Sequence, residues 1–277
     1  MYHNDNHYQQ TCVVKGKRMI HPSLGYGENE AGNVEGFTPV VLLTGADRLS
    51  LDAAVFSLVD SHPSVCSIVY DVRPDEAAES GIVLVRSVSY AGVDGVRIGG
   101  SETLPVDDCC LSCSVKHDAG RTLGQLRDRT DAFLIVLPVG MEAVPVMQYL
   151  EDSFRLDAWG EAMRVAAIAD VVGLDEFEER FFDDDRLCMY GVGEEGVFDD
   201  RSTGAVVVRL IHEASHVLQL PVVGAGCLTR HVDAVGECRC REIVRAVAAR
   251  GAVVYEDAHD VSLDDLVVRS EDVVESV

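Results

Sequence analysis

Short apolar runs alternate with stretches of helical periodicity from about residue 38 onward. Runs rich in Val, Ile and Leu, with the length of buried parallel strands, are Pro39–Gly45, Ser67–Val72, Ile82–Val88, Ala132–Leu137, Met163–Ala169, His216–Leu220 and Gly251–Tyr255. Helical patterning is found at Leu49–Asp60, Val144–Phe154, Leu174–Phe182, Ala205–Ala214 and Glu237–Arg250. Because strands that alternate with helices form sheets covered on both faces, the pattern predicts an α/β fold with a doubly wound, mostly parallel sheet.

The first part of the chain differs from the rest. Residues 1–36 are rich in His, Asn, Gln and Gly and show neither the strand period nor the helix period. We therefore expect a flexible N-terminal arm, followed by one domain over residues 37–277. His3 and His7 are spaced as metal ligands on a helix would be, but a solvated tail explains them more simply.

The composition of the chain indicates which classes of binding partner and which cellular compartment to expect. The formal net charge is -24 at pH 7, which would repel nucleic acids and anionic membrane surfaces. The sequence contains neither a long apolar run that could span a membrane nor an export leader, so we expect a cytoplasmic protein. Nine cysteines, an odd number, suit thiols or metal ligands in a reducing compartment better than a set of disulfides.

Three thiols lie within five residues at Cys109, Cys110 and Cys113. Thiolates are preferred zinc ligands, and His117 or Asp108 could complete a tetrahedral set. The alternative is that the thiols are small buried side chains, since free cysteine packs readily in protein cores. The polar flanking residues resemble a loop rather than a core element, so the cluster is predicted to bind zinc.

A second group of soft ligands consists of Cys227, His231, Cys238 and Cys240. Four such ligands within fourteen residues could form a closed structural metal site. The spacing is unlike that of a standard zinc finger, and Cys238 and Cys240 cannot both face one side of a helix. Scattered thiols around a loop remain the alternative.

His212, Glu213 and His216 match the H-E-x-x-H pattern of zinc metallopeptidases, in which the Glu is the general base. Such a helix should continue past the second His, whereas here an apolar run stopped by proline follows. The third ligand would have to be Glu237 or Glu242. A peptidase is therefore an unfavoured alternative.

The order of segments resembles the GTPase domain of the CobW-like family, the metal-chaperone relatives of the UreG and HypB GTPases. The segments that carry the resemblance are Leu43–Ala53, Asp107–Asp118, Leu134–Met147, Glu213–Ala225 and Val253–Leu266. The resemblance covers about four-fifths of the chain and implies a P-loop NTPase-like fold. The C-terminal domain usual in the family is expected to be missing.

The family's phosphate loop is degenerate in this chain. Gly45 is kept, but Ser50 stands where the second Gly is expected, Leu51 where the Lys is expected, and Asp52 where the magnesium-binding hydroxyl is expected. The base-reading N-K-x-D motif falls on the residues Pro-Val-Val-Gly at 221–224. We therefore expect a pseudo-GTPase to which GTP does not bind. A working GTPase that uses other residues is the alternative.

The residues that match the family's metal-binding motif are better preserved than those of the phosphate loop. Cys110 and Cys113 match the outer thiols of the family's C-x-C-C motif, while Ser87 falls where the family has a Glu ligand. Some members of the family are linked to zinc starvation. The resemblance therefore implies a metal-binding protein in zinc homeostasis, acting as an adaptor on a protein partner or metalloprotein client, with no direct contact to nucleic acid or membrane.

Overall fold

We describe the chain from a computed structural model. The structure describes residues 37–78, 80–92, 94–106, 110–156, 162–187, 199–222 and 234–267. The predicted arm at residues 1–36 lies outside the described residues.

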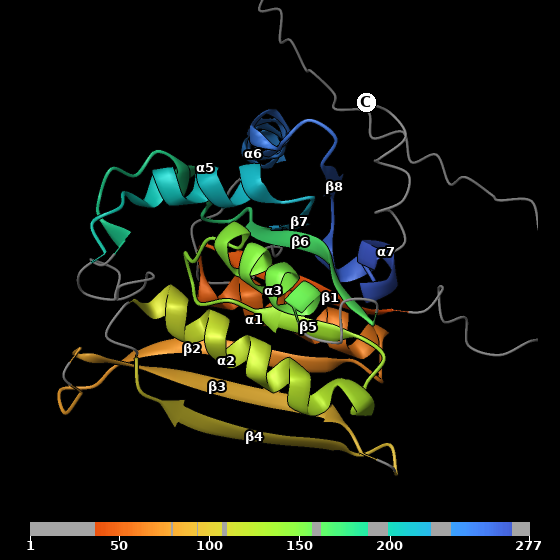
Figure 1. Ribbon diagram of the computed structural model, residues 1–277. Helices are drawn as coiled ribbons and strands as arrows, with labels where there is room; N and C mark the ends of the chain where they lie inside the picture. Colours follow the sequence, from red (N-terminus) through yellow and green to blue (C-terminus); the bar gives the residue numbers. More distant parts are fainter. Residues whose placement is uncertain are drawn as a thin grey trace, which may run out of the picture. The chain divides into compact units, whose positions relative to one another are not determined.

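Within these ranges, eight strands form one sheet in the order β4-β3-β2-β5-β1-β6-β7-β8 (Figure 1). The strands are β1 (Thr38–Gly45), β2 (Cys66–Pro74), β3 (Ile82–Ala91), β4 (Arg97–Leu104), β5 (Phe133–Val136), β6 (Met163–Gly173), β7 (His216–Leu220) and β8 (Val253–Tyr255). Six neighbouring strands, β2, β5, β1, β6, β7 and β8, run parallel to one another. Strand β3 pairs antiparallel with β2, and β4 pairs antiparallel with β3 at the edge of the sheet. The predicted α/β fold with a mostly parallel sheet is confirmed.

Helices cover both faces of the sheet (Figure 1). The helices are α1 (Arg48–Ser61), α2 (Leu111–Leu126), η1 (Arg127–Arg129), α3 (Val144–Leu156), α4 (Phe177–Phe181), α5 (Thr203–Glu213), α6 (Ala234–Val247), η4 (Ala258–Asp260) and α7 (Leu263–Val267). In β1, Val40 and Leu42 pack with α2, α3, α5 and α6. Val41 and Leu43 point to the other face and pack with α1 and α7. This alternation follows from the period of a strand, and it places β1 between two buried layers.

Strand β4 and helix α2 were not predicted, and neither were the short helices η1, η4 and α7. Strand β4 is exposed over most of its length and carries adjacent glycines, so it shows no apolar alternation. Helix α2 buries the stripe Leu111, Val115, Ala119 and Leu123, although polar residues and thiols interrupt the stripe in the sequence. The interpretation of the residues after the thiols as a loop was therefore wrong, since Lys116, His117 and Asp118 lie in α2, whereas Asp107 and Asp108 lie outside the described residues. None of the helices in the described ranges is long and apolar enough to cross a membrane.

Candidate phosphate-loop and metal sites

The turn between β1 and α1, where a phosphate loop is expected, is reduced to Ala46 and Asp47. Asp47 is the N-cap of α1, and its Oδ1 accepts a hydrogen bond from the backbone N of Ser50 at 2.7 Å. A phosphate loop offers its backbone N–H groups at this place, because the N-terminus of a helix attracts anions. In this chain the carboxylate of Asp47 takes that position, and its charge would repel a phosphate.

The predicted degenerate positions Ser50, Leu51 and Asp52 lie within α1 rather than in a loop. The side chain of Leu51 is fully buried and packs over Gly45, where an added Cβ would lie 3.0 Å from Leu51 Cγ. Asp52 is exposed and pairs with Arg48 at 3.0 Å. The positions predicted for the phosphate-binding Lys and the magnesium-binding hydroxyl are therefore a core side chain and a surface carboxylate in the structure.

In the part of the chain that the structure describes, only a small cavity lies at the carboxyl ends of β1 and β6, the edge at which nucleotides bind in open α/β sheets. The cavity there has a volume of about 20 Å³ and is lined by residues that include Asp47, Asp170 and Arg180. Arg180 of α4 donates from Nη1 to the carbonyl oxygen of Ala46 at 3.3 Å and so ties α4 to the turn. Small-molecule sites span roughly 300–1,000 Å³, so this cavity has room for water only.

Asp170 at the bottom of this cavity was not singled out by sequence reasoning. It is fully buried, and Thr44 Oγ1 donates to its Oδ1 at 2.8 Å. Burial, together with the nearby charge of Asp47, raises the pKa of Asp170 well above its ordinary value. The raised pKa favours the protonated form of this buried carboxyl over its charged form. The available signal was one carboxyl that follows the apolar stretch Val165–Ala169 within β6.

Two further segments at the carboxyl edge of the sheet are apolar where they are described. Leu137, which follows β5, is fully buried. Pro221 and Val222 follow β7, while Val223 and Gly224 lie outside the described residues.

Two of the three clustered thiols are brought together at the start of α2. Cys110 is the N-cap, and its Sγ lies 3.0 Å from Cys113 Sγ. The backbone N of Cys113 donates to Cys110 Sγ at 3.3 Å. Both side chains are partly exposed and both are thiols. Two thiolates on one tetrahedral zinc lie roughly 3.7 Å apart, so side-chain rotation would let this pair bind one ion.

The remaining predicted ligands are less well placed. Cys109 and Asp108 lie outside the described residues. His117 is exposed on α2, and its ring lies 5.3 Å from that of Tyr149. The described residues contain no group of three or more His, Cys, Asp or Glu side chains arranged to hold a metal ion. The structure therefore provides two adjacent sulfur ligands, and the full set stays a prediction.

Farther along α2, a buried carboxylate that sequence reasoning missed joins the helix to the sheet. Asp118 accepts from Tyr70 Oη at 2.8 Å and from Arg86 Nη1 at 2.8 and 2.9 Å. Arg121, one turn along, donates to Asp118 at 2.7 Å. Burial and the neighbouring Asp118 carboxylate raise the pKa of Tyr70 well above its ordinary value.

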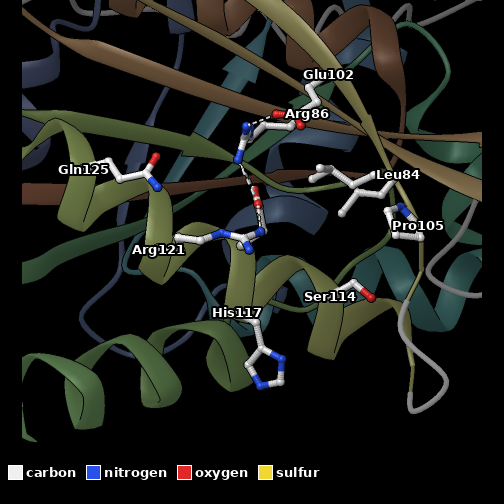
Figure 2. Close-up of a pocket in the computed structure, with 10 residues that line it drawn as sticks. Leu84, Arg86, Glu102, Pro105, Ser114, His117, Arg121 and Gln125 are labelled. Carbon is white, nitrogen blue, oxygen red and sulfur yellow. Dashed lines mark hydrogen bonds and ion pairs between the residues drawn. The ribbon is translucent and has the colours of Figure 1, made fainter.

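Arg86, Asp118 and Arg121 line a cavity of about 690 Å³ between α2 and the β3–β4 hairpin (Figure 2). Arg86 also pairs with Glu102 at 2.5 Å. The charged side chains that line the cavity therefore form ion pairs with one another. The Asp118 network therefore holds α2 against β2 and β3 and so sets the position of the thiol pair at the start of the helix.

The second thiol group is only partly described. Cys227 and His231 lie outside the described residues, whereas Cys238 and Cys240 lie on α6. Cys238 is half-buried and Cys240 is fully buried in the core. Burial raises the pKa of Cys240 and favours its thiol form. A metal site that uses Cys240 would need this thiol to lose its proton inside the core.

The H-E-x-x-H segment is divided between two elements. Helix α5 ends at Glu213, and β7 begins at His216. His212 is exposed, while His216 is buried and stacks on Tyr255 at 6.2 Å. Two imidazoles share a zinc ion in this motif only while the helix continues through both, so the segment does not have the geometry of a zinc peptidase.

Comparisons with known proteins find similarity in structure only. No protein-family model matches the chain, and no curated protein matches it in sequence. The chain is similar to the crystal structure of the zinc-bound YjiA GTPase from E. coli, with a TM-score of 0.45 and 12% identity. A zinc-bound triple mutant of YjiA gives a TM-score of 0.45 and 11% identity. Each match covers 85% of this chain and 62% of the other, so this chain spans less than two thirds of their length.

Proposed function

We propose that this chain is a CobW-like protein that has lost nucleotide binding and acts by binding zinc through Cys109, Cys110 and Cys113. In this role it serves zinc homeostasis as an adaptor that contacts a protein partner or metalloprotein client. The net charge of -24 supports a protein partner over nucleic acid.

The observation that carries the proposal is the hydrogen bond from the backbone N of Ser50 to Asp47 Oδ1. This bond satisfies the helix N-terminus from within the chain and places a negative charge where a phosphate would bind. The packing of Leu51 over Gly45 and the cavity of about 20 Å³ support the same conclusion, since each removes a feature that phosphoryl transfer requires.

The zinc part of the proposal rests on donor chemistry. Cys110 and Cys113 present two sulfurs on the same turn, and thiolates suit zinc better than hard cations such as magnesium. When bound, the ion would join the start of α2 to the segment before it. The role of the cysteines is then to hold the metal, with no reaction assigned to them.

Nucleotide titration tests the first part. Isothermal calorimetry of the full chain with GTP or ATP and magnesium should show no saturable binding. The Asp47→Asn variant should also show none, because it removes the charge but restores neither the Lys nor the hydroxyl. Saturable micromolar binding would instead support the working GTPase.

Metal analysis tests the second part. Protein purified under reducing conditions should carry zinc or take up about one equivalent, the capacity of one tetrahedral site. The double change of Cys110 and Cys113 to Ser should remove this zinc, because hydroxyls are poor ligands at a soft site. If that variant keeps its zinc and Cys238→Ser loses it, the zinc site is the downstream thiol group instead.

A further inference from the structure

The thiols of Cys110 and Cys113 are close enough to react with each other. Their sulfurs lie 3.0 Å apart, compared with about 2.05 Å in a disulfide. Cys110 precedes the helix with an extended backbone (φ -176, ψ 161), so its side chain folds over the first turn toward Cys113. Bringing the two sulfurs to bonding distance requires rotation of the side chains. Cys110 is the N-cap residue, so its backbone lies outside the helix.

The surroundings of the pair also favour reaction. Both side chains are partly exposed, so a reagent in solution can reach them. Cys66 and Cys240 are fully buried, and burial raises the pKa of Cys66 to about 12. These two provide internal controls for the reaction, since both are shielded from solvent and held as thiols.

We infer that Cys110 and Cys113 form a reversible intramolecular disulfide and that its formation releases the metal bound at the same thiols. The second half of this inference rests on the proposed zinc function, whereas the first half does not. A sulfur in a disulfide has no thiolate charge to offer a metal, so the oxidised pair and the zinc-bound pair exclude each other.

The oxidant is a disulfide of low molecular weight. The thiolate of one cysteine attacks its sulfur–sulfur bond, forms a mixed disulfide and releases one thiolate. The second cysteine then attacks the protein sulfur of the mixed disulfide, which forms the Cys110–Cys113 bond and releases the second thiolate. Two protein thiols are oxidised by two electrons, and one disulfide is reduced to two thiols.

The test uses the full chain, reduced and freed of metal, in glutathione buffers of increasing oxidised fraction. After acid quenching and alkylation, mass spectrometry of the peptides should show a bond between Cys110 and Cys113, with Cys66 and Cys240 alkylated. In Cys113→Ser, Cys110 should accumulate as the mixed disulfide with glutathione, because the resolving thiol is gone. In Cys109→Ser the Cys110–Cys113 bond should still form.

Zinc is measured in a parallel experiment. Zinc-loaded protein treated with oxidised glutathione should lose its zinc, as followed with a chromogenic chelator, and should regain it after reduction. If the disulfide forms but the reduced protein never binds zinc, the proposed zinc function fails and the redox site stands. If zinc binds but Cys110 and Cys113 remain thiols, or if Cys109 is the partner in the bond, the redox inference is overturned.

Discussion

The side chain of Asp47 accepts the backbone N–H of Ser50 at 2.7 Å, so the N-terminus of α1 is satisfied by the chain itself. The same contact has two effects. It stabilises the start of α1, because a carboxylate at this position satisfies a helix N–H group and interacts favourably with the helix dipole. It also removes the anion site on which a phosphate loop depends.

Replacing Asp47 by Ala should lower the free energy of unfolding by about 1 kcal/mol, the usual cost of losing an N-cap. Asp47→Asn should remain close to the wild type, because the Asn side chain can accept the same hydrogen bond. Urea denaturation followed by circular dichroism would measure both variants. Equal stability of the Ala and Asn variants would contradict the capping role.

Asp170 should make the stability of the fold depend on pH. Because the pKa of Asp170 is raised in the folded state, the folded protein keeps a proton that the unfolded chain releases. The free energy of unfolding contributed by this group therefore falls as pH rises from the ordinary carboxyl range, about 4, toward the raised value.

The Asp170→Asn variant keeps the acceptor for Thr44 Oγ1 and has no proton to lose. Its stability should therefore increase relative to the wild type as pH rises from about 4 toward neutrality. Thermal unfolding across this range would measure the difference, with Asp128→Asn on the exposed η1 turn as the matched control. A difference that does not change with pH would show that Asp170 is not the group responsible.

The sequence was a better guide to strands than to sites. Parallel strands such as β1 and β6 are mostly apolar, so their positions could be predicted from the apolar runs in the sequence. Strand β4 could not be predicted, because an exposed edge shows no apolar alternation.

The site depended on contacts that the sequence does not display. Asp47 was not identified as the N-cap of α1, because the resemblance aligned a longer loop at this position. The partners of Asp118 stand 48 and 32 positions earlier in the chain, on different strands. Only packing brings such distant groups together, so the Asp118 network could not be predicted from spacing.

Asp118 should be important for stability, because it balances a buried guanidinium. Changing Asp118 to Ala would leave Arg86 largely buried without its main partner, at a cost of roughly 3–5 kcal/mol. Arg121→Ala, which removes an exposed partner of the same carboxylate, should cost less than about 1 kcal/mol. Chemical denaturation would compare the two variants. Similar costs would indicate that the Arg86 pair is not the main contribution.

Glu213 should not contribute to metal binding or to catalysis. Its side chain pairs with Arg209 at 2.5 Å on the last turn of α5, while His216 lies in β7 after the helix has ended. A general base in an H-E-x-x-H site must face a zinc ion held by both imidazoles, and the change from helix to strand separates those rings.

We therefore expect Glu213→Gln to leave the zinc content unchanged, with His212→Ala as a second variant that should behave in the same way. Zinc would be measured by elemental analysis of both variants and the wild type, and a casein assay would be run in parallel. Cleavage that a chelator inhibits and that Glu213→Gln abolishes would show that the two imidazoles do converge on a metal. In that case α5 would have to extend through His216, which would break the pairing of β7 with β6 at Ala169.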